Sequence, residues 1–422
     1  MKVIAADLVL DGTGGALEKG AVILDGARIA GVGRQADIGR PEGAEVIETP
    51  PGATLLPGLI DAHVHLAYSG VPNRRRMIAE AMDQSYPQVA LRAARRARDS
   101  LLHGMTALRD MAAPGGIAID LAAAVAQGDV VGPRILACGR GLTVTGGHMD
   151  NAPFPDHTQA RGMHHPCDGA DGFRKGVRVE ARRGAGFIKI NSCVGLHNRP
   201  GTWWRPEMTV AEMEAAAEEA HAQGLTVAAH TSGGPPLTDT VRAGIDCVEH
   251  AHWIDDDCIE EMVARGTFLV PTLLVNERSF EVPLAEQGLA RVSRWSEAAR
   301  EAKWVSLARA RAAGIRVGAG TDAGFMLPHA TMFWRELALL VEGGFTPGEA
   351  IVAGTSVNAD ILGIEAGRLA PGRLADLLVV EGNPLEDIGL LGQAARLQVW
   401  KDGAQVAAGG RLTTTWPQGR AA

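Results

Sequence analysis

Short apolar runs alternate with amphipathic stretches between residues 54 and 366 of the chain. Each run is bounded by glycine or polar residues, which is typical of a buried strand, and the stretches between them are rich in the helix formers Ala, Glu and Arg. The predicted strands are residues 54–66, 105–111, 134–139, 187–193, 225–231, 247–253, 267–274 and 316–322. Eight strands joined by helical crossovers predict an α/β fold with a parallel (β/α)8 TIM-like barrel.

The two ends of the chain have a different pattern of short strands and tight turns. Asp25-Gly26 separates two apolar runs within residues 22–32, and Asp402-Gly403 does the same within residues 398–407. This dipeptide between apolar runs predicts a two-residue hairpin turn. A further strand is predicted at 374–380. Because strands from the two ends can pair, we predict a small β-sandwich made of residues 1–53 and 367–422, with the barrel of residues 54–366 between them.

Composition argues against several classes of protein. The 422 residues are 46% hydrophobic and 21% charged, which is ordinary for a globular protein with a large core. The sequence contains no run of 18 apolar residues, so no membrane span is predicted. Asp7 interrupts the first apolar run, which argues against a signal peptide. A net charge of −8 argues against a nucleic-acid partner. The five widely spaced cysteines fit a reducing cytoplasm.

Residues with metal-binding chemistry occur at the ends of the predicted strands. His63 and His65 are two positions apart at the end of the first strand, so both imidazoles would project from one face. Such a pair alone fits two ordinary polar residues equally well. However, His230, His250 and Asp322 end three further strands, and the carboxyl ends of barrel strands form one rim. This convergence predicts a metal site.

Lys189 and Asp322 each have a second interpretation. Lys189 lies within an apolar strand, where burial is costly for an unpaired ammonium and lowers its pKa. It either forms an ion pair with a nearby acid or, as a neutral amine, captures CO2 as a carbamate that bridges two metals; the histidines favour the carbamate. Asp322 lies in a glycine-rich turn and either binds a metal and accepts a proton from water, or caps the following helix.

Together these motifs resemble the amidohydrolase superfamily over essentially the whole chain and in family order. They are Pro57 to His65, Lys189, Ala229-His230, Glu249-His250, Gly320 to Asp322 and the tail of residues 372–380. The resemblance implies that His63 and His65 bind the more buried metal, that carboxylated Lys189 bridges, and that His230 and His250 bind the more exposed metal. It implies Asp322 as the catalytic aspartate on the buried metal, and a homo-oligomer. Imidazole and carboxylate donors favour zinc for the two divalent ions.

Within the superfamily, residues 132–148 resemble the prolidase-like and Xaa-amino-acid dipeptidases, whose relatives include ochratoxin-type amide hydrolases and imidazolonepropionase-like proteins. Many of these carry a Gly-Gly pair shortly after the lysine, which this chain lacks. The resemblance implies cleavage of an amide bond in a dipeptide such as Xaa-Pro, or in an N-acyl amino acid including ochratoxin-like amides, by a metal-bridging hydroxide. The alternatives are a cyclic-amide or carbamate/urea hydrolase, a non-catalytic metal-binding barrel, and a one-metal lyase or isomerase.

Substrate-binding candidates lie in the loops around this rim. They are His148 and Arg140 after the third strand, His197, Trp203 and Trp204 after the fourth, and also His252 and Tyr68. A cationic or hydrogen-bonding group there could hold a substrate carboxylate, and an indole could pack on an apolar substituent. The alternative is that Arg140 ties down a loop and that the tryptophans only pack.

Overall fold

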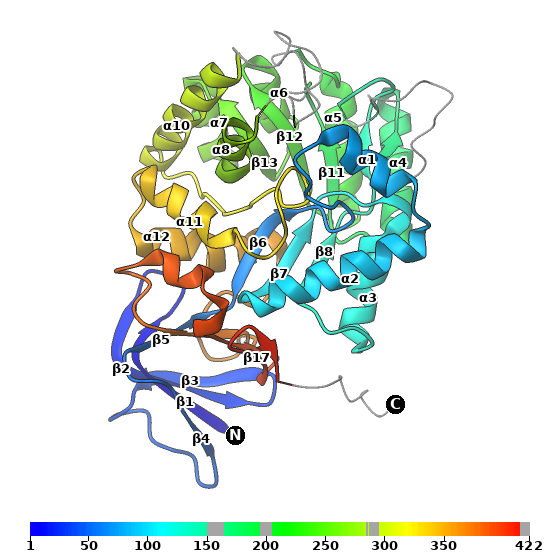
Figure 1. The fold of residues 1–422 in the computed structure, drawn as a ribbon. Helices are drawn as coiled ribbons and strands as arrows, with labels where there is room; N and C mark the ends of the chain where they lie inside the picture. Colours follow the sequence, from blue (N-terminus) through cyan, green and yellow to red (C-terminus); the bar gives the residue numbers. More distant parts are fainter. Residues whose placement is uncertain (149, 151–163, 195–204, 284–285, 287–294, 414–422) are drawn as a thin grey trace.

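The computed structural model describes residues 1–148, 150, 164–194, 205–283, 286 and 295–413. Figure 1 shows a strand-rich region at the bottom, which contains the N-terminus, and a larger body of strands and helices above it. Among the described residues, no helix is long and apolar enough to cross a membrane.

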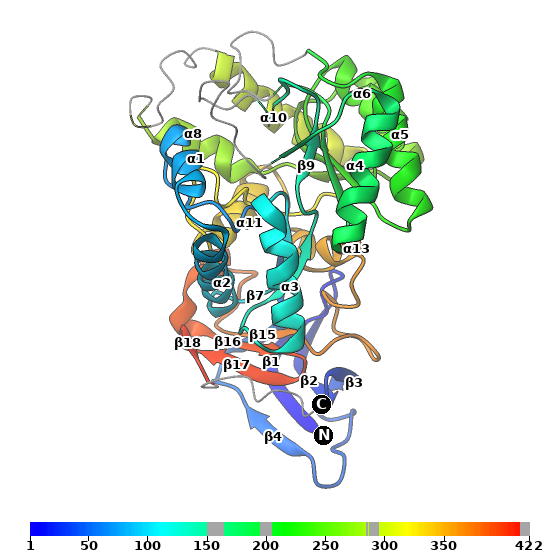
Figure 2. The same cartoon turned by 90° about the vertical axis from the view of Figure 1, so that its right-hand side faces the viewer.

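Strands from both ends of the chain form one nine-stranded sheet. The N-terminal strands are β1 (Lys2–Leu10), β2 (Ala16–Asp25), β3 (Arg28–Arg34), β4 (Glu45–Glu48) and β5 (Ala53–Pro57). The C-terminal ones are β15 (Leu377–Glu381), β16 (Leu397–Lys401), β17 (Ala404–Ala408) and β18 (Arg411–Leu412). Their order is β18-β17-β16-β15-β5-β1-β2-β3, with β4 beside β1. The antiparallel pairing of β5 with β15 joins the two ends. Figure 2 shows the C-terminal strands β15 to β18 beside the N-terminal strands β1 and β2.

Both predicted hairpins are confirmed, since β2 pairs with β3 across Asp25-Gly26 and β16 pairs with β17 across Asp402-Gly403. The nine strands form one continuous sheet. Whether this sheet folds over on itself as a sandwich stays a prediction. The single strand predicted at 54–66 is wrong. The chain leaves the terminal sheet at Pro57 and enters the body as β6 (Leu59–Val64). Gly58 lies at this junction, where a Cβ atom would be 2.2 Å from the Thr106 hydroxyl oxygen.

The body is built on parallel strands. One sheet contains β6, β7 (Met105–Asp110) and β8 (Arg134–Ala137). The other has the order β10 (His164–Pro166), β9 (Gly141–Thr143), β11 (Ile188–Asn191), β12 (Val227–Gly233), β13 (Cys247–Trp253) and β14 (Phe268–Val270). Seven of the eight predicted strands therefore overlap an observed strand.

The eighth predicted strand, residues 316–322, lacks a regular ladder but links the two sheets. On one side Gly318 donates its N–H to the carbonyl oxygen of Leu269 in β14 at 2.8 Å. On the other side Asp322 donates to the carbonyl oxygen of His63 in β6, also at 2.8 Å. These contacts connect the segment to both sheets and bring Asp322 beside His63.

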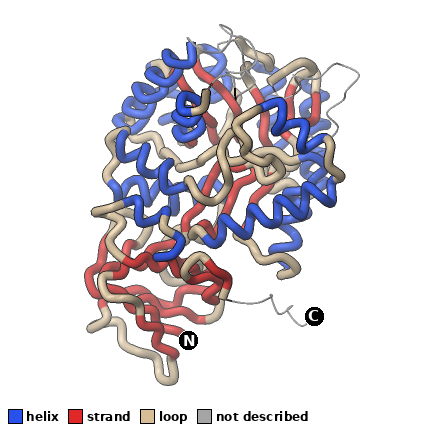
Figure 3. The backbone as a smooth tube through the Cα atoms, viewed as in Figure 1, coloured by secondary structure: helices blue, strands red, loops and turns tan. Residues whose placement is uncertain are grey.

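Helices surround the parallel strands, as Figure 3 shows. They are α1 (Arg74–Met82), α2 (Tyr86–Leu102), α3 (Ile117–Gln127), α4 (Gly169–Arg183), α5 (Val210–Ala222), α6 (Pro235–Arg242), α7 (Asp256–Arg265), α8 (Leu273–Glu281), α10 (Trp295–Ala312), α11 (Phe333–Glu342), α12 (Pro347–Val352) and α13 (Asn358–Leu362). Short 3₁₀ turns lie at Pro114–Gly116, Ile388–Gly392 and Ala394–Arg396, and a π-helical turn at Ala353–Val357. Helix α2 buries Val89, Ala93, Ala97 and Leu101, which recur every four residues and form one face.

Candidate metal centre

Three predicted ligands meet at the carboxyl end of β6. Ligand atoms of His63, His250 and Asp322 lie within 4.8 Å of one another, and all three residues are buried. The Asp322 Oδ1 atom lies 3.5 Å from His63 Nε2 and 3.2 Å from His65 Nε2. Both histidine rings therefore turn the same nitrogen toward one carboxylate, and this His/Asp cluster could hold a metal ion.

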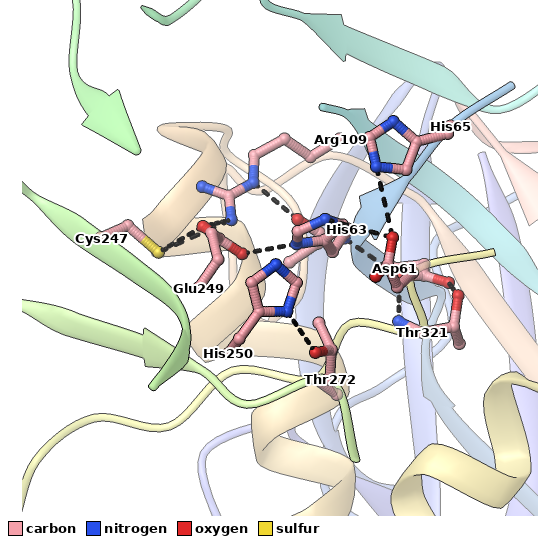
Figure 4. A network of polar contacts seen from close by, with 12 residues as sticks. Asp61, His63, His65, Arg109, Cys247, Glu249, His250, Thr272 and Thr321 are labelled. Atoms are coloured by element: carbon pink, nitrogen blue, oxygen red, sulfur yellow. Dashed lines mark hydrogen bonds and ion pairs between the residues drawn. The ribbon is translucent and has the colours of Figure 1, made fainter. Parts of the chain in front are cut away.

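The opposite nitrogens of these two rings contact other groups. His63 Nδ1 lies 2.7 Å from Glu249 Oε2, and His65 Nδ1 lies 3.5 Å from the carbonyl oxygen of Ala112. Figure 4 shows the contact between His63 and Glu249. Burial lowers the pKa of His63, and the neutral imidazole that results is the form that binds metal. Such partners orient the ring and raise its basicity as a ligand.

His250 is held by a different kind of neighbour. Its Nδ1 atom lies 2.7 Å from the Thr272 hydroxyl, and both residues have left-handed backbone, with φ values of 72° and 48°. Buried Lys303 of α10 donates to the Thr272 carbonyl at 3.1 Å. Glu336 of α11 accepts the first two N–H groups of α8, which follows directly. Burial lowers the pKa of Lys303 and raises that of Glu336. These contacts stabilise a backbone conformation that is otherwise unfavourable.

Glu249 is fully buried beneath the cluster and forms an ion pair with Arg109 of β7. The Arg109 Nη2 atom lies 2.5 Å from Glu249 Oε1, and Arg109 Nε donates to the Ala62 carbonyl at 2.6 Å. Although burial alone would raise it, the charge of Arg109 holds the pKa of Glu249 at about 2. The sequence motif contained Glu249, but no role was predicted for it or for Arg109. The feature that would have revealed Glu249 and Arg109 is the one that drew attention to Lys189, namely a charged residue inside an apolar strand.

Lys189 is buried in β11, and its Nζ atom has no hydrogen-bond partner among the described residues. Burial lowers the pKa of Lys189, although the nearby Glu249 and Asp322 carboxylates act in the opposite direction. Within the same part of the chain Lys189 forms no ion pair within 4 Å, and its carboxylation stays a prediction.

The remaining predicted ligand, His230 in β12, lies among the other histidines. Its ring centroid is 4.6 Å from that of His250, and the His250 ring is 5.1 Å from the His63 ring. The His148 ring stacks on the His230 ring, with their centroids 4.2 Å apart and an angle of 13° between the rings. The Glu207 carboxylate accepts the backbone N–H of His148 at 2.6 Å. The structure therefore brings the predicted imidazole ligands together, with one substrate-binding candidate against them.

The other substrate-binding candidates have varied surroundings. The Tyr68 ring is buried at 5.8 Å from the His65 ring, and the buried His252 ring is 5.9 Å from the Trp253 ring. Arg140 donates from Nε to Glu180 at 2.8 Å, which is the contact expected if it ties down a loop. His197, Trp203 and Trp204 lie outside the described residues. A substrate role for each of these candidates stays a prediction.

Two buried carboxylates that the sequence analysis missed connect the ligand-bearing segments. Asp61 accepts the His63 N–H and the Thr321 N–H, each at 3.1 Å, and the Thr321 hydroxyl at 2.6 Å. Asp110 accepts the Leu66 N–H at 2.8 Å. Burial raises the pKa of Asp61 to about 7 and that of Asp110 to about 6. Asp61 thus fixes the end of β6 to the segment that presents Asp322.

Comparison with known proteins now decides the family, because the Amidohydrolase family model matches residues 54–408. The chain belongs to the amidohydrolase family. The resemblance seen in its motifs is confirmed, and the protein is a hydrolase of this family rather than a non-catalytic barrel.

Individual relatives are similar to this amidohydrolase over most of their length. Ochratoxinase from Aspergillus niger is 30% identical over 423 residues, which cover 95% of this chain and 85% of that protein. The crystal structure of this ochratoxinase matches with a TM-score of 0.86 and 27% identity, covering 97% and 96% of the two chains.

Two further relatives differ in the reaction that their names describe. A Xaa-Pro dipeptidase crystallised with methionine in its active site has a TM-score of 0.85 and 28% identity, covering 96% of this chain and 99% of that one. An imidazolonepropionase from Paracoccus denitrificans is 24% identical over 405 residues, which cover 86% and 88% of the two chains.

Proposed function

We propose that this amidohydrolase is a binuclear metal-dependent hydrolase that cleaves the amide bond of a dipeptide, such as Xaa-Pro, or of an N-acyl amino acid, including ochratoxin-like amides. The observation that carries the proposal is the convergence of His63, His65 and His250 on Asp322. The similarity to an ochratoxinase and to a Xaa-Pro dipeptidase supports the substrate class. The hydrogen bonds of residues 316–322 to both neighbours support a closed (β/α)8 barrel around this site.

The residues present fit two metal ions. His63, His65 and Asp322 would hold one ion, His230 and His250 the other, and carboxylated Lys189 would bridge them. The buried Lys189 amine, which has no described hydrogen-bond partner, is suited to react with CO2 because burial lowers its pKa and so increases the share of the reactive neutral form. When bound, two divalent ions, with zinc favoured by these donors, lower the pKa of a water molecule and polarise the substrate carbonyl.

Asp322 supplies proton transfer in this proposal. Burial alone would raise its pKa, but His63 and His65 hold the pKa of Asp322 below its usual value, so the carboxylate is ionised near neutral pH. It accepts the proton of the attacking water and passes it to the leaving nitrogen. Its left-handed backbone, with a φ of 61°, aims the side chain at the two histidines. His148 and Tyr68, whose rings contact the His230 and His65 rings, would orient the substrate.

Metal analysis and a substrate screen test the proposal together. Protein purified without chelators should contain about two metal ions per chain, as expected for a two-metal site. The metal-loaded protein should hydrolyse dipeptides or N-acyl amino acids in preference to cyclic amides. Full activity of metal-free protein would contradict the metal mechanism. Hydrolysis of cyclic amides or carbamates alone would favour the imidazolonepropionase-like alternative.

Lys189→Ala tests the bridge separately. Because the carbamate supplies both bridging oxygens, this variant should lose metal and activity, and added short carboxylic acids should restore part of both. Near wild-type turnover of the variant would contradict the carbamate. The cytoplasmic location and the homo-oligomeric state stay predictions, for cell fractionation and light scattering respectively.

A further inference from the structure

We propose that Glu249 is a positioning residue that fixes His63 in the tautomer able to bind metal through Nε2, and that Arg109 holds Glu249 in this role. The inference rests on the proposed metal-dependent function. It goes beyond that function because it assigns a task to two buried residues that do not belong to the proposed ligand set.

The two oxygens of Glu249 have separate main partners. Oε2 lies 2.7 Å from His63 Nδ1, and Oε1 lies 2.5 Å from Arg109 Nη2. The Cys247 thiol also donates to Oε1, at 3.1 Å. Figure 4 shows the carboxylate between the arginine and the histidine, so Glu249 connects β13 to both β6 and β7. The Glu249 side chain is 0% exposed, and those of Arg109 and His63 are 3% and 2% exposed. Water therefore does not compete for these contacts.

This arrangement selects one tautomer of His63. A carboxylate paired with an arginine is ionised and can only accept hydrogen bonds. The proton of the neutral imidazole must then be on Nδ1, which leaves the lone pair on Nε2. That atom is the one facing Asp322, at 3.5 Å. The opposite tautomer would place the Nδ1 lone pair against the carboxylate and a proton where the metal ligand is needed.

Arg109 prevents Glu249 from taking a different role. Its Nε atom donates to Ala62, the residue directly before His63, and its guanidinium lies 5.3 Å from the centroid of the Phe187 ring. The arginine is thus fixed to the same strand that carries the histidine. If Glu249 turned away to bind a metal itself, it would leave a buried cation without its partner, which is strongly unfavourable. We therefore infer that Glu249 stays outside the ligand set.

Glu249→Gln tests this inference, because the amide keeps the shape of the side chain but adds a donor. Arg109 offers only donors, so the amide oxygen will face Arg109 and the NH2 group will face His63. His63 Nδ1 must then accept, and the proton moves to Nε2. We expect the metal dissociation constant, measured with zinc by competition with a chromogenic chelator, to rise about 10- to 100-fold. Nitrogen-15 NMR of histidine-labelled, metal-free protein should show His63 with its proton on Nε2 in the variant and on Nδ1 in the wild type.

Glu180→Gln is the matched control. Glu180 is an equally buried glutamate that also contacts an arginine and a histidine, Arg140 and His165, but it touches none of the proposed ligands. This variant should lose stability while its zinc affinity stays within about twofold of wild type.

The possible outcomes separate the inference from the proposed function. If wild-type protein binds no zinc, the proposed function fails. If wild type binds zinc and Glu249→Gln binds it equally well, or keeps the proton on Nδ1, the positioning role is wrong. Should Glu249→Gln fail to fold, the wild-type spectrum decides alone: a proton on Nε2 of His63 would overturn the inference.

Discussion

Two buried glutamates in this molecule each join an arginine to a histidine, and only one of them borders the metal centre. Arg109, Glu249 and His63 form the first group, which we call the central triad. Arg140, Glu180 and His165 form the second, the outer triad. The histidine side chain is 2% exposed in the central triad and 20% exposed in the outer one. Identical residue types thus occur in two settings.

The difference lies in how the glutamate oxygens are shared. In the central triad one oxygen faces the arginine and the other faces His63. In the outer triad the Arg140 and His165 side chains approach the same oxygen of Glu180, at 2.6 and 3.2 Å. His165 Nδ1 also lies 3.1 Å from a donor of Arg140, so it can either donate or accept. Of the two triads, the central one dictates a histidine tautomer, and among the described residues only its ring reaches a second carboxylate.

The largest effect is expected where the central triad meets Asp322. Asp322→Asn keeps the shape of the side chain but removes the proton acceptor, so kcat should fall by about 10²- to 10⁴-fold, the usual contribution of general acid–base catalysis. Steady-state kinetics on an amide substrate and circular dichroism check this. A variant that mainly raises KM would show that Asp322 binds substrate instead.

Removing the arginine from each triad compares their energetics. Arg109→Met leaves Glu249 as a buried charge without its main partner, which typically costs about 3–5 kcal/mol. Arg140→Met should cost less, because Arg183 lies 3.7 Å from Glu180 and can compensate part of its charge. Urea denaturation of both variants measures the free energies of unfolding. Equal losses would mean that the deeper burial of the central triad has no energetic consequence.

The acid dependence of stability should also differ between the variants. The pKa of Glu249 is about 2 in the folded protein, whereas the ordinary pKa of a glutamate, expected in the unfolded chain, is 4.5. Because the folded state favours the ionised carboxylate, Glu249 stabilises the fold above pH 4.5. This contribution is lost as the pH falls from about 4.5 toward 2, when the unfolded state binds the proton first. The stability gap between wild type and Glu249→Gln, measured by denaturation of metal-free protein, should therefore narrow over this range. If the difference in stability stays constant over this pH range, the charge of Glu249 does not cause the difference.

The smallest effect is expected at the outer histidine. His165→Asn removes a contact to an oxygen that Arg140 already occupies, so the free energy of unfolding should change by less than about 1 kcal/mol, the range of a single hydrogen bond. Zinc affinity should be unchanged, whereas His63→Asn should lower it. Loss of zinc binding in the His165 variant would contradict the assignment of the outer triad as structural.

Periodicity and spacing in the sequence predicted much of this fold. Both Asp-Gly hairpins were found because a tight turn depends on local backbone preferences. The division of residues 54–66 into two strands was missed because the run is buried on both sides of Pro57-Gly58. Continuous hydrophobicity reports burial but does not say which sheet a strand joins.

At the site, the ligands were predicted from side chains that converge on strand ends, but their partners were not. Arg109 and Glu249 lie on strands that do not pair with each other, so only the folded structure shows that they meet. Arg140 and Arg109 are equally charged residues near strand ends, and the sequence singled out the one that forms the outer triad. The choice of partner depends on distances across the interior, which no local pattern encodes.

The pairing of β5 with β15 has a consequence for synthesis on the ribosome. The Thr54 hydroxyl bonds to the carbonyl of Gly382, 328 positions later in the chain. At about 5–20 residues per second, translation takes on the order of 20–60 s to reach that partner. During this interval β5, whose five residues are all buried in the finished protein, presents an apolar edge that can pair with another nascent chain. The chain's topology therefore leaves this edge open to mispairing until β15 emerges.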